Sequence, residues 1–209
     1  MHTSKSRLYK QAAFFLSITL LSSCATERGA LHLPHYLQTN LSPAEFMVCH
    51  GYGCHYQTKT YFSDAQWQQV KKPLTTKANN PEQERQHIAE AIAIMEVLVG
   101  EAVGTQTDKG GAGFMVSDTG QMDCIDEAVN TSLYLQFLSQ EDMLKWHSVE
   151  SPTRRGYFID AQWPHNSAVI KDNTTDIRYV VDSWFFDNGE QPVIIPVQQW
   201  LTGWRPPGH

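Results

Sequence analysis

A cysteine, a histidine and an aspartate in the second half of the chain have the side-chain types needed for nucleophilic catalysis. Cys124 follows Asp123, and apolar residues then recur at helical spacing, which predicts a helix that Asp123 caps and Cys124 begins. Free backbone N–H groups and the positive end of the helix dipole favour a thiolate at such a position. The pattern predicts a cysteine nucleophile, with a buried structural cysteine as the alternative.

The base and the acid that would serve this thiol lie in a predicted hairpin, where two strand-like runs flank the turn-rich segment 172–176. If the turn is centred between Asn173 and Thr174, His165 and Asp182 face each other directly across the two strands. An imidazole that accepts the thiol proton and a carboxylate that orients the imidazole complete a catalytic triad. We expect the thiol, the imidazole and the carboxylate to form one hydrogen-bonded line.

Two further residues belong to this hypothesis. Gln121 precedes Cys124 by three positions, and we expect its side chain to complete an oxyanion hole with the backbone N–H of Cys124. His147 is the alternative base, and we prefer His165 because no aspartate is expected to face His147.

A resemblance to a known group rests on three segments, at 123–128, 165–169 and 181–184. They resemble the transglutaminase-like and papain-like cysteine enzymes, including the bacterial transglutaminase-like cysteine peptidases. The resemblance implies that Cys124 is the nucleophile, His165 the base and Asp182 the orienting acid.

The same resemblance implies a function in which the thiolate attacks an amide carbonyl and forms a thioester. Water would resolve the thioester in a peptidase or amidase, and an amine would resolve it in an acyltransferase. A catalytically silent binding module with the same fold is the alternative, because a fold does not fix a function. The substrate is expected to be a peptide or protein amide.

The first residues resemble the leader of a bacterial lipoprotein. Residues 1–23 contain a basic start and the apolar run 12–21, which is too short to span a bilayer comfortably, and they end in small residues directly before Cys24. We expect Cys24 to be lipidated and to become the mature N-terminus, with 24–42 as a tether. The expected location is the cell envelope, at the outer membrane facing the periplasm. A plain signal peptide is the alternative.

Composition and charge describe an ordinary acidic domain. The 209 residues are 41% hydrophobic and 18% charged, which predicts one globular domain at 43–204 followed by a short tail at 205–209. The formal charge is −6, and it becomes −9 without residues 1–23, which carry three basic and no acidic side chains. Nucleic acid is therefore not an expected partner.

The cysteines divide by their expected roles. With Cys24 assigned to lipid and Cys124 to chemistry, Cys49 and Cys54 are left to form a short-loop disulfide in an oxidising compartment. The spacing from Cys49 to Cys54, followed by His55, is also similar to a rare form of c-type haem attachment. A haem protein is therefore a further alternative to the reading that we prefer, in which we expect no cofactor and no metal site.

The remaining patterns predict an α+β fold of the papain or transglutaminase-like type, with helices of the first half packed on an antiparallel sheet of the second. Capping signals predict helices at 41–48, from Ser63, and from Asn80 to Gly104. Further strands are expected at 146–150 and 156–160, with a connection at 152–155, and a proline-bounded segment at 192–197 is expected at a sheet edge.

Overall fold

The fold is α+β. A computed structural model describes residues 42–112, 118–156 and 164–208 of the chain. These ranges form two antiparallel sheets and four helices. The domain boundaries expected at residues 23 and 42 fall at or before the start of the first described range.

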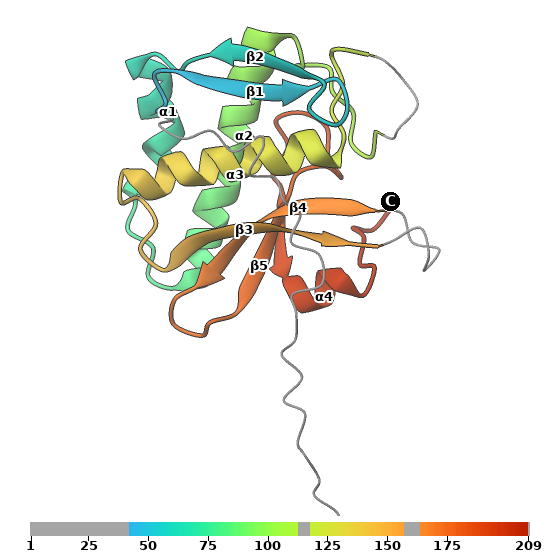
Figure 1. Ribbon diagram of the computed structural model, residues 1–209. Helices are drawn as coiled ribbons and strands as arrows, with labels where there is room; N and C mark the ends of the chain where they lie inside the picture. Colours follow the sequence, from blue (N-terminus) through green and yellow to red (C-terminus); the bar gives the residue numbers. More distant parts are fainter. Residues whose placement is uncertain (1–41, 113–117, 157–163, 209) are drawn as a thin grey trace, which may run out of the picture.

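Helix α3 (Cys124–Gln140) lies at the centre of the molecule, between the two sheets (Figure 1). On one side it contacts β1 (Phe46–His50), and on the other it contacts β3 (His147–Arg155), β4 (His165–Asp172) and β5 (Arg178–Asp182). Most of its side chains are therefore buried all around the helix, and its polar side chains must find partners inside the protein.

The larger sheet has the strand order β3, β4, β5, β6, where β6 is Val193–Pro196, and every neighbouring pair is antiparallel. The expected edge position of the proline-bounded segment is confirmed. The expected break at 152–155 is wrong, because β3 is a single strand that passes this segment through an irregularity between Glu150 and Thr153. The strand expected at 156–160 lies almost wholly outside the described residues.

The first half supplies α1 (Asp64–Thr75) and α2 (Pro81–Val103), and both begin where the capping signals predicted. Ser63 and Gln66 form a capping box at the start of α1. Asn80 caps α2, and the backbone N–H of Gly104, in the left-handed conformation with φ 91°, closes its last turn on Gly100.

The helix predicted at 41–48 is not formed, because the chain makes a tight turn from Ser42 to Glu45 and then enters β1. The strand β1 pairs with β2 (Tyr56–Thr60). Phe46 and Val48 alternate toward the core, where Phe46 packs against aromatic rings of the neighbouring elements. Burial of these alternating apolar side chains stabilises a strand more than the capping pattern at Ser42 stabilises a helix, and the same capping residues also suit a turn.

The last described helix, α4 (Val197–Leu201), covers the face of the larger sheet that α3 does not cover. Trp200 from α4 is fully buried and packs with Val169 of β4 and Val180 of β5. The sheet therefore carries a core on each face, and alternate residues of β4 and β5 belong to different cores.

Candidate active site

Cys124 is the first residue of α3, as predicted, and Asp123 is the N-cap. The carboxylate of Asp123 accepts the backbone N–H groups of Ile125 and Asp126, and the Asp126 side chain accepts the N–H of Asp123 in return. This capping box fixes the backbone on both sides of the thiol. Among the described residues Cys124 is the one cysteine outside a disulfide.

The His165 and Asp182 side chains are hydrogen-bonded to each other. The distance from Nε2 of His165 to Oδ2 of Asp182 is 2.7 Å, and both side chains are almost completely buried. The same Oδ2 accepts Nε1 of Trp200 at 2.7 Å. The ring of His165 also packs against Trp184 and Phe185, with centroid distances of 4.6 and 5.3 Å. The imidazole is thus held by one carboxylate and by aromatic rings.

The predicted contact is present, but the predicted register is wrong. Ala168 pairs with Val181, and continuing this register places Asp182 opposite Ser167 rather than opposite His165. The turn centre lies one residue later than expected, so the direct partner moves by two positions. A shift of two keeps every side chain on its face, and His165 reaches Asp182 diagonally across the strands.

The Cys124 sulfur lies beside the backbone of His165. Sγ is 3.9 Å from the carbonyl oxygen of Pro164 and receives the backbone N–H of Asn166. In an extended strand these two groups, on either side of one residue, point to the same side of the chain. A sulfur that contacts both of them is therefore aligned with residue 165 along the strand, where β4 extends past the end of β5.

The predicted line of hydrogen bonds is only half formed. The side chains of His165 and Asp182 lie on the α4 face of the sheet, whereas Asn166, on the α3 face, donates from Nδ2 to the Cys124 sulfur at 3.6 Å. Among the described residues, Cys124 makes no hydrogen bond to His165. Nδ1 of His165 is buried and has no hydrogen-bond partner among the described residues, so one ring nitrogen of the imidazole stays unpaired.

The environment of the thiol favours its neutral form, contrary to the expectation from the helix terminus. Burial raises the pKa of Cys124 to about 12, the nearby Asp123 and Asp182 carboxylates raise it too, and the two hydrogen bonds from Asn166 lower it only in part. Loss of solvation therefore outweighs the helix dipole, so a base must accept the proton as the sulfur reacts.

Gln121 does not point its amide group at the sulfur. Its Nε2 donates to the carbonyl oxygen of Thr107 at 3.0 Å, and its Oε1 accepts the backbone N–H of Lys109 at 3.1 Å. The side chain therefore joins two loops. The polar side chain that reaches the thiol is Asn166, which sequence reasoning missed, although strand alternation after His165 would have placed it on the α3 face.

The predicted disulfide between Cys49 and Cys54 is formed, and its loop is attached to the start of α3. The Asp126 carboxylate accepts the backbone N–H groups of Tyr52 and Cys54 at 2.8 and 2.6 Å. Four consecutive residues, Gly51 to Cys54, have positive φ, a conformation that is unfavourable for Tyr52 and Cys54. The loop holds this conformation while it covers the helix terminus that carries Cys124.

Cys49, Cys54 and Asp126 form a cluster of possible metal ligands, but their groups already act as a disulfide and as a capping carboxylate. Ligand atoms of Cys49, Cys54 and Asp126 lie within 4.8 Å of one another. The two sulfurs are bonded to each other, which also leaves no thiol for haem attachment, and the carboxylate already accepts three backbone N–H groups.

His147, the alternative base, lies in a different network, and the expectation that no aspartate faces it is wrong, because β3 and β4 pair it with Asp172. Its Nδ1 donates to Glu84 at 2.9 Å, and its Nε2 is 3.2 Å from a guanidinium nitrogen of Arg85. Glu84 also accepts three backbone N–H groups, two from the connection between α3 and β3 and one from the start of β3. His147 is therefore a structural histidine that joins α2 to the larger sheet.

Cys24 and the rest of the predicted leader lie outside the described residues. Within the described ranges, none of the helices combines the length and the apolar character that a membrane span requires. Comparison with protein-family models, curated proteins and solved structures gave no match to this chain.

Proposed function

We propose that the protein is a cysteine enzyme of the transglutaminase-like or papain-like type that acts on amide bonds. The observation that carries the proposal concerns the start of β4. There, His165 is hydrogen-bonded to Asp182, and the backbone directly before His165 contacts the thiol at the N-terminus of α3. The unpartnered Nδ1 of His165 is the nitrogen that would accept the thiol proton. The resemblance of the three sequence segments is the second support.

In the proposed reaction, Sγ of Cys124 attacks the amide carbonyl as its proton passes to Nδ1 of His165. The tetrahedral intermediate collapses when the amine takes this proton and leaves, which gives a thioester. Water then yields a carboxylic acid, as in a peptidase or amidase, or a second amine yields a new amide, as in an acyltransferase. Asp182 keeps the imidazole oriented and stabilises its charged form.

The oxyanion of the intermediate requires hydrogen-bond donors beside the sulfur. We assign this role to Nδ2 of Asn166 and to the backbone N–H of Cys124, in place of Gln121, whose amide is held by the 107–109 loop. Nδ2 donates to the sulfur in the resting protein and would turn to the adjacent oxygen during attack.

A catalytically silent module with the same fold is the second candidate. The observation in its favour is the thiol itself, which is buried, has a pKa of about 12 and is not bonded to His165. In this reading the Cys124 side chain only packs, and the domain serves the envelope by binding.

The two candidates differ in how folding changes the reactivity of the thiol. A peptide vinyl sulfone is reacted with the folded protein and with the urea-unfolded chain, and labelling of the Cys124 peptide is followed by mass spectrometry. An enzyme labels faster when folded, and His165→Ala removes that advantage. A packed structural cysteine labels more slowly when folded, which would support the silent module.

We also propose that the chain is a lipoprotein anchored through Cys24 in the cell envelope, from the leader pattern alone. Radiolabelled palmitate should be incorporated by the wild type and lost in Cys24→Ser. Incorporation that persists in Cys24→Ser would contradict a lipid on this cysteine.

A further inference from the structure

A cavity of about 390 Å³ lies at the end of the molecule where α3 terminates. It is lined by the end of α1, the segment that follows it, the start of α2 and the connection from α3 to β3. Because α3 has 17 residues and rises about 1.5 Å per residue, this cavity is roughly 25 Å from Cys124. The proposed reaction does not use it.

One wall of the cavity is apolar and consists of Leu74, Ala78, Met143 and Trp146. Leu74 and Met143 also pack against the main core, so they connect the cavity to the centre of the protein. Nε1 of Trp146 donates to the carbonyl oxygen of Ala78 at 3.3 Å, and this hydrogen bond joins two residues of the lining. A wall of aliphatic, thioether and indole groups suits an apolar ligand body.

The backbone of residues 145–147, next to this wall, is held in place by hydrogen bonds. The carboxylate of Glu84 accepts the N–H groups of Lys145, Trp146 and His147, at 2.8, 2.9 and 3.0 Å, as well as Nδ1 of His147. Four donors occupy the acceptor positions of this carboxylate, so Glu84 shapes the cavity without offering it a free charge. A cavity that is formed before binding loses little entropy when a ligand enters.

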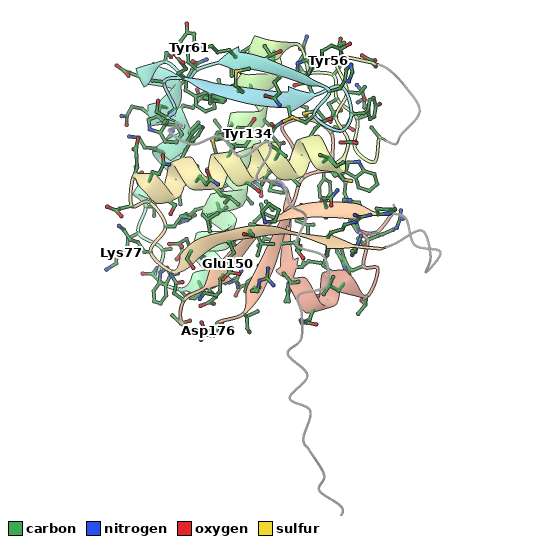
Figure 2. The ribbon with its side chains drawn as sticks, viewed as in Figure 1. Tyr56, Tyr61, Lys77, Tyr134, Glu150 and Asp176 are labelled. Carbon is green, nitrogen blue, oxygen red and sulfur yellow. A yellow bond between two sulfur atoms is a disulfide. The ribbon has the colours of Figure 1, made fainter. Side chains whose placement is uncertain are left out.

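The free charges of the lining are mainly positive. Lys77 and Lys145 both line the cavity, and neither forms an ion pair with a described residue. Figure 2 shows Lys77 at the edge of the molecule near the last turn of α3. Asp142 is the one lining acid besides Glu84. An apolar wall with two available ammonium groups complements a molecule that has an apolar body and one anionic group.

We propose that this cavity binds a small amphiphilic carboxylate, with its apolar body against Trp146 and Met143 and its carboxylate at Lys77 and Lys145. The volume is within the range of about 300 to 1,000 Å³ that is usual for small-molecule sites. The site is separate from the thiol, and the proposal is independent of the function proposed above.

The test is calorimetric titration of the full chain carrying Cys124→Ala, so that no ligand is turned over. The probe is decanoate below its micellar concentration, and decyltrimethylammonium, with the same chain length and opposite charge, is the second probe. Decanoate should bind with one-to-one stoichiometry and about tenfold or more tighter than the cation, because charge-assisted hydrogen bonds favour the carboxylate.

Two variants locate the site. The double variant Lys77→Gln, Lys145→Gln should weaken decanoate binding by about tenfold or more. Lys59→Gln on β2, whose ammonium group pairs with Glu45 at 2.7 Å, is the matched control and should bind as the parent does. Met143→Trp should fill the cavity and abolish binding, while its far-UV circular dichroism stays unchanged.

Equal binding of the carboxylate and the cation would overturn the proposal, because it would show unselective uptake of amphiphiles. Absence of decanoate binding, or binding that survives both the double lysine change and Met143→Trp, would also overturn it. None of these results depends on whether Cys124 is catalytic.

Discussion

His165 and Trp200 donate to the same carboxylate oxygen of Asp182, each at 2.7 Å. The indole N–H and the imidazole N–H therefore fix the carboxylate from two directions, and Trp200 also lies against the imidazole with a centroid distance of 5.4 Å. The orientation of His165 thus depends on a residue of α4, far along the chain from both strands of the hairpin. Asp182 and Trp200 therefore set the position of the proposed base together, in addition to the rings of Trp184 and Phe185.

Replacement of Asp182 by Asn should slow the reaction of Cys124 with a peptide vinyl sulfone by at least about tenfold, and by up to roughly 10⁴ if the pair acts as in serine protease triads. The amide can no longer accept both donors with a full charge, and it stabilises the charged imidazole poorly. The measurement is the rate of vinyl sulfone labelling at pH 7.

Asp176→Asn is the matched control, because Asp176 is an exposed aspartate in the neighbouring turn (Figure 2). It should label at the wild-type rate. If Asp182→Asn also labels at that rate while it remains folded, the orienting role of Asp182 is wrong.

Alkylation of Cys124 by iodoacetamide should keep accelerating from pH 7 to pH 10 without reaching a plateau. Iodoacetamide reacts with thiolate, and burial raises the pKa of this thiol to about 12, so the thiolate fraction grows over this whole range. Asn166→Ala should lower the rate at each pH, because the side-chain hydrogen bond that favours the thiolate is lost. A plateau below pH 8 would instead indicate a preformed thiolate and imidazolium pair.

Loss of the disulfide should reduce the free energy of unfolding by about 2 kcal/mol, the value expected from chain entropy for a short loop. The double variant Cys49→Ala, Cys54→Ala is compared with the wild type by urea unfolding. Reductant should destabilise the wild type to a similar extent and leave the double variant unchanged. Equal stability of the two proteins under oxidising conditions would contradict the prediction.

Stability should fall as the pH rises from about 4 to about 7. Burial raises the pKa of Glu96, Asp108 and Asp126 to about 7 in each case. Over this range the folded chain therefore holds protons that the unfolded chain has released, and each released proton favours unfolding. Burial also raises the pKa of Glu127 well above its ordinary value, so the fall should continue above pH 7. Urea unfolding between pH 4.5 and pH 8.5 measures the slope.

Asp108→Asn should reduce that slope, because its amide oxygen can still accept the Met122 N–H, which Asp108 binds at 2.6 Å, without titrating. Glu101→Gln, at an exposed position of α2, is the control and should leave the slope unchanged. Stability that rises through this pH range would show that the buried acids are ionised in the folded protein.

Local signals on the chain predicted the helices well. Ser63, Asn80 and Asp123 all cap helices by hydrogen bonds that involve residues within three positions, so the sequence contains the complete interaction. The same kind of signal at Ser42 was wrong, because the alternative to a helix was pairing with β2, and that pairing depends on residues 6 to 14 positions away. A local sequence pattern does not show whether a distant strand is available for pairing, so it cannot decide between a helix and a strand here.

In the site, too, the local pattern predicted some contacts, whereas others depend on how distant elements pack. Alternation along paired strands was enough to bring His165 and Asp182 together even though the register was wrong by two. The contact of Trp200 with Asp182 and the contact of Asn166 with the thiol arise from the packing of α4 and α3 on opposite faces of the sheet. No spacing in the sequence indicates how α4 packs on the sheet, so Trp200, the second partner of the Asp182 carboxylate, was missed.

The placement of α3 between two sheets also decides which amide protons should resist exchange with solvent. Its second half, around Leu133 to Leu138, is enclosed on both sides and should exchange only when the whole domain opens. Cys124 stands at the boundary of this slow-exchanging unit, in the first turn, where N–H groups have no intrahelical carbonyl partner. The thiol is therefore attached to a helix that should exchange slowly, and the protection of its own first turn depends on the capping box of Asp123 and Asp126.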